Sequence, residues 1–162
     1  MREKPLIGII LPTLALLTFG CLGQAFGPTQ CDGLAGQTLA ITRSDYSKCA
    51  GEILGTLDEL EKSLNRFVGG DAAAKDPAVS ASRKLAHLIS EAGLQADAWR
   101  EVKGGSGRTV ERWPDASMRG FNAQVINAAA QFNAVLAYPN QDNLQQGARL
   151  HADARSSYSQ FR

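Results

Sequence analysis

The sequence lacks the residue patterns of most catalytic and metal-binding proteins. It has three cysteines in 162 residues and no Cys-x-x-Cys pair, the spacing typical of structural zinc sites. No phosphate-cradling glycine loop precedes a helix pattern, and neither histidine belongs to a Ser-His-Asp or Cys-His arrangement. We therefore predict a protein that is not an enzyme, with no catalytic residue and no metal site.

The chain also lacks an excess of charge of either sign. Seventeen Lys and Arg residues face 16 Asp and Glu residues, so the chain has no electrostatic footprint for nucleic acid. No stretch alternates with period two, and we therefore expect no sheet. The chain is 44% hydrophobic, which is enough for one compact domain.

The N-terminal residues have the layout of an export signal. Arg2 and Lys4 precede the apolar run Leu6–Phe19, and no further charge occurs before Asp32. If it is not cleaved, Leu6–Phe26 approaches the roughly 20 apolar residues that span a bilayer. Residues 1–20 are thus predicted to be a lipoprotein-type signal peptide or a membrane anchor, and the protein to be periplasmic and membrane-anchored.

Two processing routes are open. Thr18-Phe19-Gly20-Cys21 resembles a bacterial lipobox, in which the cysteine is acylated, so Cys21 is a candidate for lipidation. Cleavage after Ala25, with small residues at Gly23 and Ala25, is the alternative.

Cys31 and Cys49 then remain as an even pair in an oxidising compartment. A disulfide between them would close a loop of 18 residues and contribute about 3 kcal/mol in the chain-entropy model. The alternative is two unpaired thiols, with Cys49 a small buried hydrophobe.

Apolar residues recur at helical spacing in four segments that follow an irregular linker over residues 21–36. The predicted helices are Gln37–Val68, Asp76–Lys103, a third from near Trp113 to Tyr138, and a fourth that begins after an Asn140 cap. Residues 37–162 are therefore predicted to be an all-α, antiparallel four-helix bundle.

Helix boundaries follow from glycine and proline. Gly69-Gly70 ends the first helix, and Asp71–Lys75 is expected to be a linker. Asp76 is predicted to cap the second helix, with Pro77 in its first turn. Gly104–Gly107 breaks the chain before the third helix.

The last residues resemble a covalent haem-attachment motif in their spacing, but its cysteines and histidine are replaced. A c-type site reads Cys-x-x-Cys-His; here Ala154 and Ser157 stand at the cysteine positions and Tyr158 at the histidine position. The terminal Phe161-Arg162 matches the aromatic-Arg pair that often follows this motif in the cytochrome c-prime family, which this chain resembles.

Further short matches to that family lie upstream. Ala40-Ile41-Thr42-Arg43 is similar to the start of the family's first helix, and Val110–Asp115 with Phe121 is similar to the entry of its third. The resemblance covers Gln37–Arg162.

The resemblance implies a periplasmic bundle with a haem near the end of the fourth helix, used for electron transfer or gas binding. In this chain Ala154 and Ser157 cannot form thioethers, and Ser47 stands where the family has a pocket Leu or a ligand Met. We therefore expect no cofactor and regard Ala154, Ser157, Tyr158 and Ser47 as vestigial positions. The alternative is a non-covalently held haem with Tyr158 as its phenolate ligand.

The remaining polar residues have ordinary interpretations. His87 is expected to be solvated. His151 is expected to be a hydrogen-bonded histidine among the apolar residues at helical spacing in the fourth predicted helix. Asp58, Glu59 and Glu61 are interpreted as a charged, solvated face.

One long uncharged stretch suggests a partner. No charge occurs from Gly120 to Gln141, whereas a solvated helix usually carries charges on its outer face. The predicted partner face consists of Asn122, Gln124, Asn127, Gln131 and Asn133. Chance composition is the alternative.

Together these patterns predict a non-catalytic, haem-less envelope protein, a structural or binding subunit of a membrane or electron-transfer assembly. The alternative is a periplasmic electron-transfer or gas-binding cytochrome with non-covalent haem.

Overall fold

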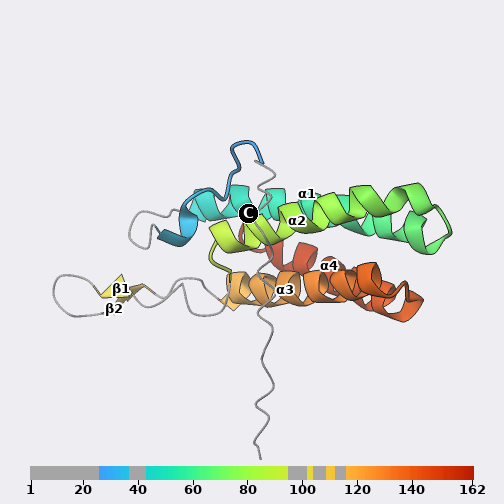
Figure 1. Cartoon of the computed structure of the whole chain (residues 1–162). Helices are drawn as coiled ribbons and strands as arrows, with labels where there is room; N and C mark the ends of the chain where they lie inside the picture. The colour runs from blue at the N-terminus through green and yellow to red at the C-terminus, as the bar shows by residue number, and fades with distance from the viewer. Residues whose placement is uncertain (1–25, 37–42, 95–101, 104–108, 112–115) are drawn as a thin grey trace, which may run out of the picture.

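The computed structural model describes residues 26–36, 43–94, 102–103, 109–111 and 116–162 (Figure 1). These residues form four α-helices: α1 (Arg43–Val68), α2 (Lys75–Glu91), α3 (Ala116–Ala137) and α4 (Gln141–Tyr158). Two short 3-10 helices, η1 (Leu34–Gly36) and η2 (Ala72–Ala74), and two short strands, β1 (Val102–Lys103) and β2 (Thr109–Glu111), complete the description.

The four helices pack as a bundle of two layers. α1 and α2 form one layer and α3 and α4 the other (Figure 1). Across the layers α1 packs against α4, and α2 packs against α3. The predicted helical bundle is therefore confirmed at this level.

The predicted apolar stripes form the core. The α3 residues at helical spacing are all buried: Met118, Phe121, Val125, Ala128, Phe132 and Val135. The α1 residues at this spacing are also buried, except for the half-buried Phe67: Cys49, Ile53, Leu57, Leu60 and Leu64. Burial of each large apolar side chain contributes about 1.5–3 kcal/mol, so the stripes account for the way the helices pair.

The turn between α1 and α2 differs from the prediction. Gly70 ends α1 with a φ of 100°, and the Asp71 carboxylate accepts the Ala73 N–H at 3.1 Å. Asp71 thus caps η2, which fills the expected linker and leads directly into α2. The prediction that Asp76 caps the second helix is wrong, because α2 begins at Lys75 after Ala74 and has no side-chain cap. Pro77 is tolerated in the first turn of α2, where backbone N–H groups have no intrahelical partner.

α2 ends at Glu91, and the prediction that it continues to Lys103 is wrong. Gly93 has a φ of 63°, and the Leu94 N–H donates to the Ile89 carbonyl at 3.1 Å. This is a Schellman-type end, in which Leu94 turns into the core and is 2% exposed. Residues 95–101 of the predicted helix lie outside the described residues.

The expectation of no sheet is also wrong. Val102–Lys103 pairs antiparallel with Thr109–Glu111. A ladder of two or three residues is too short to leave the four-to-eight-residue alternation by which a strand is recognised in sequence.

The fourth helix begins as predicted. The Asn140 side-chain oxygen accepts the N–H groups of Asp142 at 2.7 Å and Asn143 at 3.2 Å, a standard N-cap.

Several predictions fall on residues outside the description: the starts of the first and third helices, the signal or anchor, Cys21 and the cleavage site after Ala25. Within the described ranges, no helix has both the length and the apolar character needed to cross a membrane.

Candidate functional site

Four aromatic rings cluster around the C-terminal segment, which holds the positions predicted to be a vestigial haem motif. Phe161 is 1% exposed, and its ring centroid lies 5.3 Å from that of Tyr46, 5.6 Å from Phe121 and 5.4 Å from Tyr158. Tilted and edge-to-face pairs at these separations are favourable. The rings, from α1, α3, α4 and the segment after α4, therefore form a packed part of the core.

The side chain of Asn122 belongs to this cluster and not to a partner face. Asn122 is 6% exposed, and its Oδ1 accepts a hydrogen bond from the Tyr46 hydroxyl. Its assignment to the outer face is therefore wrong. The sequence held a signal for this burial, because Asn122 lies four residues after Met118 and three before Val125, which is itself core spacing.

The positions predicted to be vestigial haem-site residues are engaged in protein contacts. Ala154 is fully buried, and the Ser157 hydroxyl donates to Gln124 Oε1 at 2.8 Å. Tyr158 is half-buried with its hydroxyl against α1, since a Cβ added at Gly51 would lie 3.0 Å from that oxygen. Alanine and serine offer no thiol, so these residues do not fit a covalently attached haem.

Ser47 lines a groove that does not include the other three positions predicted to be vestigial. It lines an open groove of about 320 Å³ together with Ser44, Lys48, Phe161 and Arg162. A haem ligated by Tyr158 would have to displace that side chain from its packing against Gly51 and Phe161.

His151 is buried between α4 and α1, and the prediction of a hydrogen-bonded histidine is confirmed. It is 3% exposed, and its Nδ1 lies 2.7 Å from Glu61 Oε2. The Asp58 carboxylate contacts the Arg155 guanidinium. Asp58 and Glu61 thus face α4 and do not form the purely solvated face that was predicted, whereas Glu59 is exposed. The pairing depends on how α1 and α4 are aligned, which local sequence does not encode.

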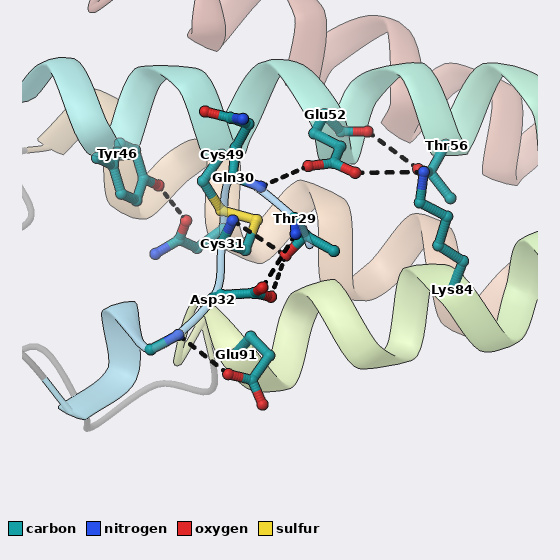
Figure 2. The surroundings of a disulfide bond; sticks show 12 residues. Thr29, Gln30, Cys31, Asp32, Tyr46, Cys49, Glu52, Thr56, Lys84 and Glu91 are labelled. Carbon is teal, nitrogen blue, oxygen red and sulfur yellow. Dashed lines mark hydrogen bonds and ion pairs between the residues drawn. A yellow bond between two sulfur atoms is a disulfide. The ribbon is translucent and has the colours of Figure 1, made fainter. Parts of the chain in front are cut away.

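The disulfide fastens the linker to the bundle. Cys31 and Cys49 are buried and bonded, with an S–S distance of 2.08 Å (Figure 2). Beside it, the Gln30 N–H donates to Glu52 at 2.8 Å and the Gly33 N–H to Glu91 at 3.1 Å. The linker is therefore pinned to both α1 and α2.

Two further side chains belong to this linker region. Hydrogen bonds from the Thr29 hydroxyl and N–H hold the pKa of the Asp32 carboxyl below its usual value. His87, predicted to be solvated, is half-buried and stacks on the Phe26 ring at 5.4 Å between centroids.

The predicted partner face is smaller than expected. Apart from Asn122, Gln124 accepts from Ser157, and the exposed Asn133 accepts from Ser82 at 2.6 Å. Asn127 remains exposed and Gln131 half-exposed. The outer face of α3 is completed by Ala123, Ala130, Ala137 and the adjacent Tyr138, which is 80% exposed.

Comparisons of the chain with protein-family models, with curated proteins and with solved structures found no match. Among the residues that the structure describes, no group of three or more His, Cys, Asp and Glu side chains has a metal-binding arrangement. What the fold defines is a four-helix bundle with a filled core, a pinned N-terminal linker and an uncharged outer face on α3.

Proposed function

We propose that this chain is a haem-less relative of the cytochrome c-prime family. It acts, without catalysis, as a structural or binding subunit of a larger assembly in the bacterial envelope. The supporting features are the bundle, the C-terminal Ala154-x-x-Ser157-Tyr158 spacing and the short matches at the starts of the first and third helices.

The observation that carries the proposal is the packing of Tyr158. Its ring lies 5.4 Å from Phe161, and its hydroxyl abuts α1 at Gly51. A haem ligand needs an open face toward the iron, whereas here the replaced ligand is used to join α4 to α1. With Ala154 buried and Ser157 bonded to Gln124, the positions that once bound a cofactor now stabilise the bundle.

The uncharged face of α3 supports a partner. Charged side chains are costly to desolvate, and they are depleted in the centres of protein interfaces. α3 carries no charge from Gly120 to Ala137 and presents Asn127, Ala130 and the exposed Tyr138. We propose that this face docks on another envelope protein, while the N-terminal segment, lipidated at Cys21 or retained as an anchor, holds the chain at the membrane.

A hemin titration tests the loss of cofactor. The purified full-length protein is expected to be colourless, and one equivalent of hemin should leave the free-hemin absorption spectrum unchanged. Tyr158→Phe removes only the hydroxyl and is the matched control. Near-stoichiometric binding with a Soret band in the native protein, lost in Tyr158→Phe, would instead establish the cytochrome with non-covalent haem.

A second experiment tests the docking face. The protein is purified from membranes of its own host after mild cross-linking, and the yield of the cross-linked partner is measured. Ala130→Glu places a carboxylate on the α3 face and should lower that yield at least about tenfold, because the charge must be desolvated. Ala86→Glu makes the same change at an exposed site on α2 and should leave it unchanged. Equal yields from both variants would exclude α3 as the docking face.

A further inference from the structure

A groove of about 460 Å³ is lined by α1, α2 and the start of the linker. Three cationic side chains belong to its lining: Lys62 and Arg66 of α1 and Lys84 of α2. Lys62 and Arg66 are four residues apart, and residues at this spacing share one face of a helix. Glu59 is the only carboxylate in the lining. The groove therefore presents three positive charges and one negative charge.

Each of the three cations has hydrogen-bond donors to spare. Lys62 forms no ion pair or hydrogen bond with another described residue. Arg66 binds Asp71 through Nε and Nη2, which leaves the two N–H groups of Nη1. Lys84 Nζ lies 3.2 Å from Glu52 Oε1 (Figure 2), and an ammonium has three N–H groups. An anion in the groove can thus be bound without breaking either ion pair.

The rest of the lining is apolar or carries a hydroxyl. Phe26, Pro77 and the buried Ala81 supply apolar surface, and Ser63 and Ser80 supply hydroxyl groups. A free phosphate ion would make no use of the apolar surface. A phospholipid has a phosphate group for the cations and adjoining glycerol and acyl carbons for the apolar residues, and basic residues beside a membrane attachment are typical of binding to anionic lipids.

The groove lies where the chain enters the bundle. Phe26 is the first described residue, and its ring stacks on His87 of α2 at 5.4 Å between centroids. The apolar run Leu6–Phe19 ends seven residues before Phe26, a stretch that spans at most about 25 Å when fully extended. A membrane that holds the N-terminal segment is therefore within reach of the groove.

We propose that this groove binds the headgroup of an anionic phospholipid, with the three cations on its phosphate group and the apolar residues against its glycerol carbons. The inference rests on the proposed attachment to the membrane and adds an orientation to it. A bundle held in this way turns its α1–α2 layer toward the membrane. The outer face of α3 belongs to the other layer (Figure 1) and stays accessible to a protein partner.

Lysine acetylation measures the occupancy of the groove. The full chain is reconstituted in phosphatidylcholine vesicles with and without phosphatidylglycerol, pulsed with acetic anhydride and analysed by mass spectrometry. A bound headgroup should shield Lys62 and Lys84, which should react about fivefold more slowly on the anionic vesicles. Lys48 is exposed on α1 outside this groove and should react equally on both. Inorganic phosphate added to the neutral vesicles should not shield any of them.

Lys62→Gln tests the charge of the groove with the same readout. The change removes a cation that has no partner among the described residues, so it breaks no ion pair. At a fixed phosphatidylglycerol fraction, the ratio of shielded to free Lys84 should fall about fivefold. Lys48→Gln is the matched control, because it removes the same charge from the same helix, and it should leave the ratio unchanged.

Three results would overturn the proposal. Equal slowing at Lys48 would mean that the whole surface is attracted to the vesicle. Equal shielding by inorganic phosphate or by neutral vesicles would mean that the groove does not recognise an anionic lipid, and unchanged shielding of Lys84 in Lys62→Gln would exclude the cations as its ligands. Retention of the chain on neutral vesicles reports the N-terminal attachment alone, so the attachment and the groove can fail separately.

Discussion

At the scale of single residues, polar groups inside the bundle account for most of the disagreement between sequence and structure. Asn122 and His151 both lie at core spacing, and each has a partner on α1: Tyr46 for Asn122, and Glu61 for His151. A buried polar group must be hydrogen-bonded, so each of these residues depends on a partner more than 70 positions away. Sequence periodicity locates such residues on the inner face but does not name their partners.

Asn122→Ala tests the first of these pairs. The change removes the Asn122 Oδ1 acceptor of the buried Tyr46 hydroxyl and leaves its longer bond to the Met118 carbonyl at 3.4 Å. It should lower the free energy of unfolding by about 0.5–1.5 kcal/mol, the net contribution of one hydrogen bond. Asn127→Ala, at an exposed site on the same helix, should change it by less than about 0.5 kcal/mol. Urea denaturation measures both, and a double-mutant cycle with Tyr46→Phe isolates the pair. If Asn122→Ala costs no more than Asn127→Ala, the bond does not stabilise the fold.

At the scale of the element, glycines within helices have opposite roles that composition does not reveal. Gly147 of α4 sits against Phe132 of α3: an added Cβ would lie 2.5 Å from Phe132 Cε1. Gly55 of α1 is exposed, and an added Cβ would meet nothing within 4 Å. Gly147 thus permits the close packing of α3 and α4, whereas Gly55 only weakens its helix.

The same substitution at these two sites should therefore have opposite effects. Gly147→Ala forces α3 and α4 apart and should destabilise the protein by about 1–3 kcal/mol. Gly55→Ala should stabilise it by about 0.5–1 kcal/mol, because alanine has the higher helix propensity. Thermal unfolding followed by circular dichroism compares them directly; a stabilising Gly147→Ala would show that α3 and α4 are not packed at this contact.

At the scale of the whole molecule, the linker and the uncharged face belong to different layers. The linker is fastened to α1 through Cys49 and to α2 through Glu91 (Figures 1 and 2). The uncharged outer face belongs to α3, in the other layer. The described part of the linker, residues 26–36, therefore lies on the α1–α2 layer, and the proposed docking face is on the α3–α4 layer.

The disulfide should contribute to the stability of the whole bundle. Replacing both Cys31 and Cys49 by alanine opens a loop of 18 residues and should cost about 3 kcal/mol in the chain-entropy model. Urea unfolding with and without reductant measures the loss. Reductant should destabilise the native protein and leave the double variant unaffected; an equal response of the two would mean that the bond does not contribute.

The sequence by itself determined the elements that depend on local or periodic signals. Apolar residues at helical spacing predicted the core faces of α1 and α3, the Asn140 side chain predicted the start of α4, and Gly69-Gly70 predicted the end of α1. Each of these signals acts within a few residues of the chain, so it can be seen without a fold. The early end of α2 at Glu91, before the turn at Gly93, was missed because helical spacing continues beyond it, while the burial of Leu94 favours the turn.

Only the tertiary structure decided which residues meet. The alignment of α1 with α4 brings Glu61 and Asp58 to His151 and Gly51 to Tyr158, and the alignment of α1 with α3 brings Tyr46 to Asn122. These contacts depend on how the helices slide and rotate against one another, and the packing of all four helices together sets that alignment. The resemblance to a haem-attachment motif was a prediction from the sequence, whereas the packing of Tyr46, Phe121, Tyr158 and Phe161 is a property of the folded bundle.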